Sequence, residues 1–191
     1  EYVTGYFTVD GQKMSKSLGN VVDPVEMVQK YDRDALVFML MYDVPIWSDG
    51  DFSEERLVNV YDSMLIGAWW NLVNRVVSLC SKYGIKEGRY VNEDFFSWFD
   101  FSKIEEKYLN SGNLQGYLQD WYKFVQLANE YITKAEPWKK YKDENTKEQA
   151  ISDLQFLLYV VKNLALLSAP FLVNGFQKIQ HMFGNEVLSK I

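Results

Sequence analysis

The chain has 191 residues, of which 48% are apolar and 24% are charged, and this balance excludes a disordered protein. Its 4 proline and 11 glycine residues are too few for a collagen-like or low-complexity chain. The 20 basic and 26 acidic side chains give a net charge of −6, which argues against non-specific nucleic-acid binding. Any contact with a nucleic acid must therefore depend on a local basic patch.

The counts of cysteine and histidine restrict the chemistry further. Cys80 is the only cysteine and His181 the only histidine, so the sequence predicts neither an internal disulfide nor a metal site, and a reducing, cytoplasmic compartment is expected. The most apolar run, residues 156–173, is interrupted by polar side chains such as Lys162, so no membrane span is predicted. Because residue 1 is a glutamate, we expect the chain to begin inside a longer protein.

The first 50 residues predict a mixture of strand, loop and helix. In chain order the elements are a strand at 2–9, a turn at 10–11, a polar loop at 12–20 and helices at 24–31 and 34–42. Asp23 is a suitable N-cap for the first helix, Pro24 suits its first position, and Glu26 completes a capping box. Pro45 and the polar cluster at 48–51 end the second helix.

Everything after residue 52 predicts helices, joined by an aromatic-rich connector at 88–100. The predicted helices cover 53–83, 103–110, 113–134, 147–168 and 172–183, and capping boxes occur at 102–105 and 146–149. On the first of them, which Gly84 ends, one apolar stripe comprises Tyr61, Leu65, Ala68, Trp69, Leu72, Val76 and Leu79. Such stripes can be buried only by packing helix on helix, so a mainly α bundle is expected.

The most informative motif is the segment Lys13-Met14-Ser15-Lys16-Ser17 (KMSKS). Composition alone indicates a solvated polar loop with two free lysines. The same residues also suit a polyphosphate clamp, because lysine supplies a mobile positive charge while serine hydroxyls and loop amides donate to phosphate oxygens. Such a clamp would stabilise the negative charge that builds on a departing pyrophosphate.

Residues 11–24 (GQKMSKSLGNVVDP) resemble the second signature of the class I aminoacyl-tRNA synthetases. In that family the loop closes over ATP while the aminoacyl-adenylate forms. The resemblance therefore implies that residues 13–17, Met14 among them, bind ATP. It implies that Lys16 contacts the phosphates and stabilises the transition state, that Lys13 assists it, and that Ser15 and Ser17 order the loop.

Four later stretches narrow the resemblance to the methionyl-tRNA synthetase family. They are 49–55 (DGDFSEE), 71–75 (NLVNR), 129–138 (NEYITKAEPW) and 164–171 (LALLSAPF). The resemblance implies that residues 1–50 are the end of a catalytic core with a helical linker. It implies that residues 51–191 are an α-helical anticodon-binding bundle.

In that family the positions of Asn71, Arg75, Pro137 and Trp138 contact the CAU anticodon. Asn71 and Arg75 are four residues apart and share one helix face, where an amide and a guanidinium can read unstacked base edges. Trp138, held by Pro137, is a possible platform for a flipped base. Chemistry alone also allows a helix-packing pair and a tryptophan buried in the core.

A basic collar surrounds Trp138 in the sequence and would suit phosphate contacts near a stacked base. It consists of Lys134, Lys139, Lys140, Lys142 and Lys147. The alternative is a solvated connector between helices. Two positions depart from the family pattern: Trp70 replaces a small residue, and Val173 stands where proline is more usual, so we expect a changed helix junction there.

The resemblance implies a methionine–tRNA ligase that uses ATP with Mg²⁺, methionine and the anticodon stem-loop of tRNA(Met), with no membrane association. This part alone should bind no cofactor and be inactive, since the methionine pocket and any zinc site would lie upstream. Two alternatives stay open. One is the same region of a leucyl, isoleucyl, valyl or cysteinyl enzyme, and the other is a non-catalytic RNA-binding module derived from such an enzyme.

Overall fold

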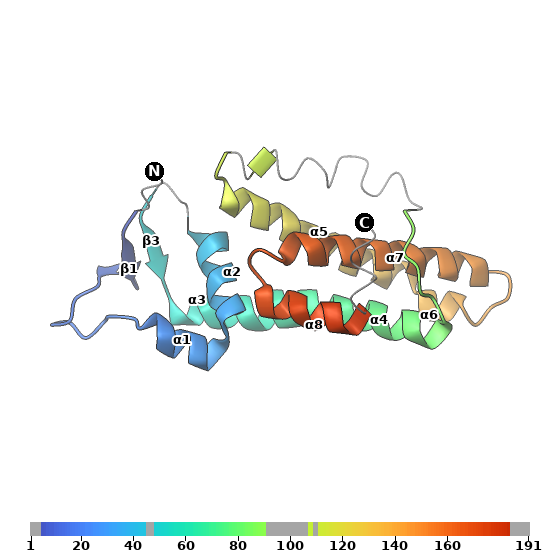
Figure 1. The fold of residues 1–191 in the computed structure, drawn as a ribbon, viewed down its shortest axis with the longest axis horizontal. Helices are drawn as coiled ribbons and strands as arrows, with labels where there is room; N and C mark the ends of the chain where they lie inside the picture. Colours follow the sequence, from blue (N-terminus) through green and yellow to red (C-terminus); the bar gives the residue numbers. More distant parts are fainter. Residues whose placement is uncertain (1–4, 45–47, 91–106, 109–110, 184–191) are drawn as a thin grey trace.

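The computed structural model describes residues 5–44, 48–90, 107–108 and 111–183. The described chain is elongated, with a small sheet at one end and helices along the rest of its length (Figure 1). Several predictions lie outside the described residues: the strand at 2–4, Pro45, most of the connector, the capping box at 102–105 and most of the helix at 103–110. The fold of the described part is mainly α, as predicted.

The sheet has three short strands in the order β2-β1-β3. Strand β1 (Phe7–Val9) pairs antiparallel with β2 (Gln12–Lys13) and parallel with β3 (Gly50–Phe52). The turn between β1 and β2 has positive φ at both Asp10 (48°) and Gly11 (74°), which is the geometry of a tight two-residue hairpin. The predicted turn is confirmed.

Strand β3 was not predicted, and its segment was assigned to a helix-breaking polar cluster. It forms by pairing with β1, which lies far away in the chain: Phe7 is in register with Gly50, and Thr8 with Asp51. The Asp51 carboxylate also accepts hydrogen bonds from the Thr8 hydroxyl (2.5 Å) and the Gly11 amide (2.8 Å). Neither pairing leaves a periodic pattern within residues 48–52 themselves.

Two helices follow the hairpin. Helix α1 (Pro24–Tyr31) begins as predicted, with the Asp23 carboxylate accepting from the Val25 amide at 2.8 Å. Helix α2 (Arg33–Asp43) buries one side, including Phe38 and Met39, against the rest of the core. The two helices are therefore where the N-terminal region joins the bundle.

The predicted helix at 53–83 is continuous but not uniformly α-helical. It consists of α3 (Glu54–Asn59), a π-helical stretch η1 (Val60–Trp70) and α4 (Asn71–Tyr83), with Gly84 as the C-cap. The looser π winding changes which residues face inward: Val60 and Met64 are buried, whereas the predicted Tyr61 and Ala68 are only partly covered. A regular 3.6-residue repeat cannot predict that shift.

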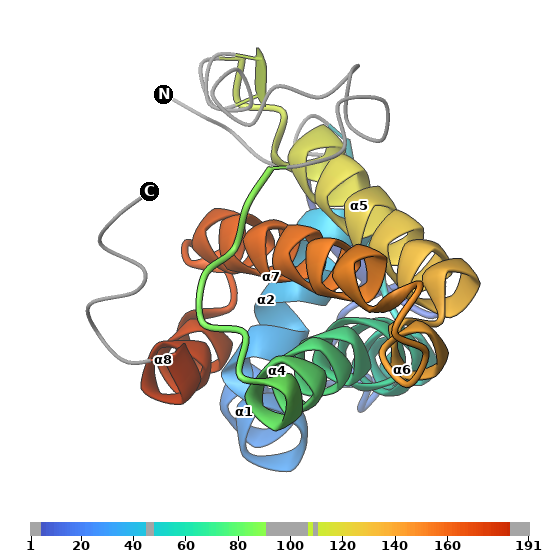
Figure 2. The same ribbon diagram turned by 90° about the vertical axis from the view of Figure 1, so that its right-hand side faces the viewer.

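The remaining helices complete the bundle around α7. They are α5 (Leu114–Ala135), the four-residue α6 (Pro137–Lys140), α7 (Lys147–Ser168) and α8 (Val173–Phe183). Helix α7 contacts α4, α5, α6 and α8, and the end-on view places it between α5 and the pair α4 and α8 (Figure 2). It is long and apolar enough to cross a membrane, but 67% of its most apolar window is buried inside the fold, as in a core helix.

Aromatic side chains hold the centre of the bundle together. Trp121 on α5 lies 5.2 Å from Trp69, 5.4 Å from Phe171 and 5.8 Å from Phe38, measured between ring centroids, in edge-on arrangements. Its indole N–H donates to the Leu164 carbonyl of α7 at 2.9 Å. The core is thus continuous from α2 to α7, across the domain boundary predicted at residues 50 and 51.

The two departures from the family pattern meet at the start of α8. A Cβ on Gly175 would lie 3.4 Å from Trp70, so the large Trp70 ring lies against the start of α8. Helix α8 begins at Val173, and its next two residues donate to the corner between α1 and α2: Asn174 to Asp32 (2.9 Å) and the Gly175 amide to Asp34 (2.7 Å). Asp34 therefore satisfies an amide that α8 itself leaves unpaired.

We expect Asp34→Ala to lower the free energy of unfolding by about 1–3 kcal/mol, because the buried Gly175 amide loses its acceptor. Urea unfolding of the chain measures this difference. Asp62→Ala, at an exposed position of η1, is the control and should leave the value unchanged. Equal stability of Asp34→Ala and the parent chain would contradict this account of the junction.

Candidate functional site

Arg75 and Trp138 meet at the surface of the bundle. The Arg75 guanidinium carbon lies 5.7 Å from the centroid of the Trp138 ring, within the range of a cation–π contact. The pair lines an open pocket of about 380 Å³. Its lining residues are Asn74, Arg75, Ser78, Leu79 and Trp138. The pocket thus combines an aromatic face, a planar cation and two polar side chains.

Trp138 owes its position to the sharp turn between α5 and α6. Glu136 adopts a left-handed backbone (φ 43°, ψ 52°), which ends α5, and Pro137 begins α6 at once. Pro137 is buried and Trp138 is partly buried against the core. One face of the turn is therefore fixed in the bundle, while the tryptophan reaches the pocket.

A polar cluster holds α6 on α7. Lys140 donates to one oxygen of Asp153 at 2.8 Å, and the Tyr131 hydroxyl donates to the other oxygen at 2.8 Å. The Thr146 hydroxyl donates to the Lys140 carbonyl at 2.9 Å. Since Asp153 is buried, with 7% of its surface exposed, this ion pair is little screened by solvent.

Most of the predicted basic collar is neutralised by nearby carboxylates. The ion pairs are Lys134–Glu130, Lys139–Glu136, Lys140–Asp153 and Lys147–Glu144. The hydrogen bond from Lys147 to Glu144 raises the pKa of the lysine. Within the described part of the chain, Lys142 is the collar member that is exposed and has no ion pair. The collar therefore carries less available positive charge than the sequence suggests.

The loop at 12–20 is organised by Asn20. Its side chain accepts from the Ser15 amide at 2.8 Å and donates to the Lys13 carbonyl at 3.1 Å. The hydroxyls of Ser15 and Ser17 lie 2.7 Å apart. The loop thus has a defined backbone although its tip is exposed.

Both lysines of this loop are exposed and make no ion pair with any residue that the structure describes. Behind them, the hydrogen bond from Thr8 and then that from the Gly11 amide lower the pKa of Asp51, which keeps this carboxylate charged while it holds the hairpin. Lys13 and Lys16 are therefore available to an anionic ligand, on a hairpin that the hydrogen bonds of Asp51 hold in place.

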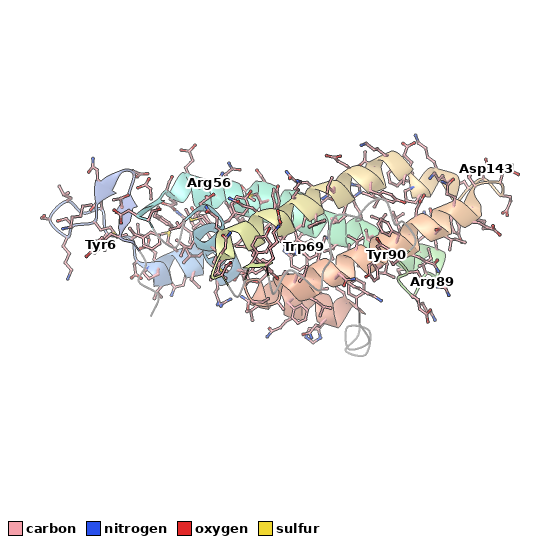
Figure 3. All side chains as sticks on the ribbon, turned by 90° about the horizontal axis from the view of Figure 1, so that it is seen from above. Tyr6, Arg56, Trp69, Arg89, Tyr90 and Asp143 are labelled. Carbon is pink, nitrogen blue, oxygen red and sulfur yellow. The ribbon has the colours of Figure 1, made fainter. Side chains whose placement is uncertain are left out.

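The loop at 12–20 lies at one end of the molecule, beyond the small sheet, whereas helix α6, which carries Trp138, lies toward the other end (Figure 1). Tyr6, which precedes β1, and Asp143, on the turn after α6, mark the two ends (Figure 3). Across the residues that the structure describes, no three His, Cys, Asp or Glu side chains are grouped so that they could hold a metal ion. The two candidate sites thus depend on cationic, hydroxyl, amide and aromatic groups.

Comparison with known families assigns both ends of the chain. Residues 2–77 match the family described as tRNA synthetases class I (M), and residues 121–189 match the anticodon binding domain of methionyl tRNA ligase. The methionine–tRNA ligase of Campylobacter jejuni is 34% identical over 191 residues, which are 97% of this chain and 30% of that protein. The chain belongs to the methionyl-tRNA synthetase family.

Further relatives agree with this assignment. The methionine–tRNA ligase of Thermotoga maritima is 32% identical over 185 residues, covering 93% of this chain and 29% of that protein. The structure of Mycobacterium tuberculosis methionyl-tRNA synthetase in complex with methionyl-adenylate has a TM-score of 0.79 and 26% identity, over 92% of this chain and 36% of that chain. The chain thus spans about 30% of the length of the curated relatives it matches.

Of the four residues predicted to contact the anticodon, the fold brings Arg75 and Trp138 together. Asn71 is exposed one turn earlier on α4 and does not line the pocket, and Pro137 is buried and fixes the start of α6. Contact of these four residues with the anticodon stays a prediction.

Sequence reasoning missed three residues that line the pocket, Asn74, Ser78 and Leu79. Their spacing from Asn71 and Arg75 in the sequence would have been enough to predict them. Asn74 is three residues after Asn71, and Ser78 and Leu79 are three and four residues after Arg75, so helical geometry places all of them on or beside one face.

We expect Asp153→Ala to lower the free energy of unfolding by about 2–3 kcal/mol, because Lys140 and the Tyr131 hydroxyl both lose their acceptor. For a chain of this size the thermal midpoint should fall by roughly 5–10 °C, as measured by calorimetry. Gln149→Ala, exposed on the same helix, is the matched control. A midpoint equal to that of the control would mean that the cluster does not hold α6.

Proposed function

We propose that this chain is the C-terminal part of a cytoplasmic methionine–tRNA ligase and that its bundle binds the CAU anticodon of tRNA(Met). The observation that carries the proposal is the Arg75 guanidinium placed 5.7 Å from the Trp138 ring in an open pocket. Membership of a family whose anticodon-binding domain matches residues 121–189 supports it. Arg75 and Trp138 belong to the segments 71–75 and 129–138, from which anticodon contact was predicted.

The pocket suits an unstacked base. The indole face of Trp138 offers a stacking surface, and base stacking on an aromatic side chain contributes about 1–3 kcal/mol. Arg75 supplies donors for base carbonyl and ring nitrogen atoms, and the amide of Asn74 both donates and accepts. We assign Asn71, one turn away on the same helix, to a neighbouring base.

For the other end of the molecule we propose that residues 13–17 bind the phosphates of ATP during methionine activation. Lys16 is the residue we assign to the phosphates in the transition state, with Lys13 as its partner. The exposure of both ammonium groups and the fixed backbone around Ser15 support this assignment. Two lysine ammonium groups and two serine hydroxyls suit phosphate oxygens.

The complete reaction requires parts that the chain does not contain. ATP with Mg²⁺ and methionine would bind mainly to the remainder of the ligase, which would also hold any zinc site. The role we assign to this chain is to supply the phosphate-binding loop and to select the tRNA. Alone it should bind RNA and form no adenylate.

We expect Trp138→Ala to weaken binding of a CAU anticodon hairpin about tenfold or more, because the stacking surface is lost. The measurement is a titration of the chain at fixed low salt with hairpins that carry CAU or single-base variants. Trp138→Phe retains a ring and should lose less. Tyr6→Ala removes an exposed aromatic at the opposite end and should bind normally.

Two results would count against the proposal. Parent chain that binds all hairpins equally would remove the CAU assignment. Trp138→Ala that binds the CAU hairpin as tightly as the parent chain, with its far-ultraviolet circular dichroism intact, would remove the stacking role of Trp138.

In the full-length ligase, we expect Lys16→Ala to slow methionine-dependent ATP–pyrophosphate exchange by about 10²–10³-fold, because a positive charge is lost where the transition state gains negative charge. Hairpin binding should be unchanged, since the loop lies far from helix α6, which carries Trp138. Lys86→Ala, another exposed lysine, is the control. Normal exchange by Lys16→Ala would refute the assignment and favour a non-catalytic RNA-binding role for this chain.

A further inference from the structure

A second aromatic surface lies next to the Arg75–Trp138 pocket. The rings of Tyr83, at the end of α4, and Tyr141, just after α6, are stacked with their centroids 3.7 Å apart and an interplanar angle of 21°. Both tyrosines are partly exposed. We call this stacked pair the tyrosine platform.

The platform has a lysine against each ring. The ammonium of Lys82 lies 5.5 Å from the Tyr83 centroid, and that of Lys147 lies 5.6 Å from the Tyr141 centroid. Lys142, next to Tyr141, is exposed and forms none of the ion pairs found in the described part of the chain. Cationic side chains beside aromatic rings on which bases can stack are the combination that single-stranded nucleic-acid sites use.

The carboxylates near the platform are already engaged. Glu144 forms an ion pair with Lys147 at 3.0 Å, and Asp143 accepts hydrogen bonds from the backbone and side chain of Asn145. Among the described residues, Lys82 and Lys142 form no ion pair with a carboxylate. The local balance therefore permits a phosphate to approach the platform.

The platform continues the same face of α4 that forms the pocket. Arg75, Leu79 and Tyr83 follow one another at intervals of four residues, and Leu79 lines the pocket. Across the pocket from α4, Trp138 and Tyr141 are three residues apart in the chain. Along α4 the distance from Arg75 to Tyr83 is about 12 Å, which exceeds the spacing of two stacked bases, about 3.4 Å.

We infer that the tyrosine platform is a second nucleotide-binding site, which stacks on an unpaired anticodon-loop base outside the CAU triplet while Lys82 and Lys142 contact its phosphate. This inference rests on the proposed anticodon-binding function and extends it to a neighbouring nucleotide. The separation along α4 means that this base is held apart from the one on Trp138. Stacking reads every base similarly, so the platform adds affinity without selecting the triplet.

The test uses Tyr83→Leu and Tyr141→Leu in the 191-residue chain, titrated with CAU hairpins whose loop nucleotides outside the triplet are replaced one at a time by abasic residues. We expect each variant to bind the intact hairpin about tenfold more weakly. One abasic position should weaken binding by the parent chain about as much as the tyrosine substitutions do. At that position the variants should bind no more weakly than they bind the intact hairpin. The preference for CAU over single-base variants should be retained.

Matched controls separate binding from folding. Tyr141→Phe keeps the ring and should bind as the parent chain does. Tyr90→Leu removes another exposed tyrosine, which lies in a different ring cluster with Phe156 and Tyr159, and should also bind normally. Thermal midpoints of all variants show whether a lost affinity accompanies lost structure.

The outcomes distinguish this inference from the proposed function. Parent chain without a preference for CAU would overturn both. Parent chain with that preference, but with Tyr83→Leu and Tyr141→Leu at parental affinity, would overturn the platform alone and leave the tyrosines as a clasp between α4 and α6. A tenfold loss that is equal on intact and on every abasic hairpin would also overturn the platform, because no nucleotide would then be its ligand.

Discussion

The ion pair between Lys140 and Asp153 is the interaction on which the candidate RNA-binding surface depends. Helix α6 has only four residues, far fewer than a helix needs to persist alone in water. Its conformation must therefore be imposed from outside, and Asp153 on α7 contributes to this by accepting a hydrogen bond from Lys140 of α6 and another from Tyr131 of α5, each at 2.8 Å. Removal of one partner would leave a largely buried charge unpaired, which is why such pairs are costly to break.

The same arrangement limits how the surface can bind RNA. Lysines that fix α6 and its flanking turns are engaged with carboxylates and contribute little to phosphate binding. The net charge of −6 further weakens long-range attraction. Affinity must then come mainly from stacking on aromatic rings and from a few free cations. The stacked Tyr83 and Tyr141, beside the Arg75–Trp138 pocket, are consistent with a surface of that kind.

What the sequence predicted, and what it did not, follows from the range of each interaction. The Asp23 cap and the Gly84 C-cap depend on near neighbours and were predicted correctly. Strand β3 depends on a partner more than 40 residues away, with Phe7 in register with Gly50, and was missed. The inward face of the helix at 53–83 was predicted only in part, because the π-helical winding of η1 is set by packing and not by local propensity.

The candidate site divides in the same way. Helical spacing alone places Asn71 and Arg75 on one face, but nothing local brings Arg75 to Trp138, which is 63 residues further along the chain. That contact depends on the left-handed turn at Glu136, an unusual conformation for a residue with a side chain, and on the anchoring of α6. Resemblance to a family supplied the pair, whereas Asn74 and Ser78 are neighbours that helical spacing allows and that the pocket in the fold identifies.

The relation between the two ends of the molecule is fixed by one continuous helix. Near its start, Glu54 accepts hydrogen bonds from Lys30 and Tyr31 of α1, and Arg56 forms two hydrogen bonds with Asp43 of α2. Beyond the π-helical stretch, the same helix carries Arg75. The corner between α1 and α2 is tied a second time, through Asp34, to α8. The helix that carries Arg75 is therefore bonded near its start to α1 and α2, the two helices that follow the loop at 12–20.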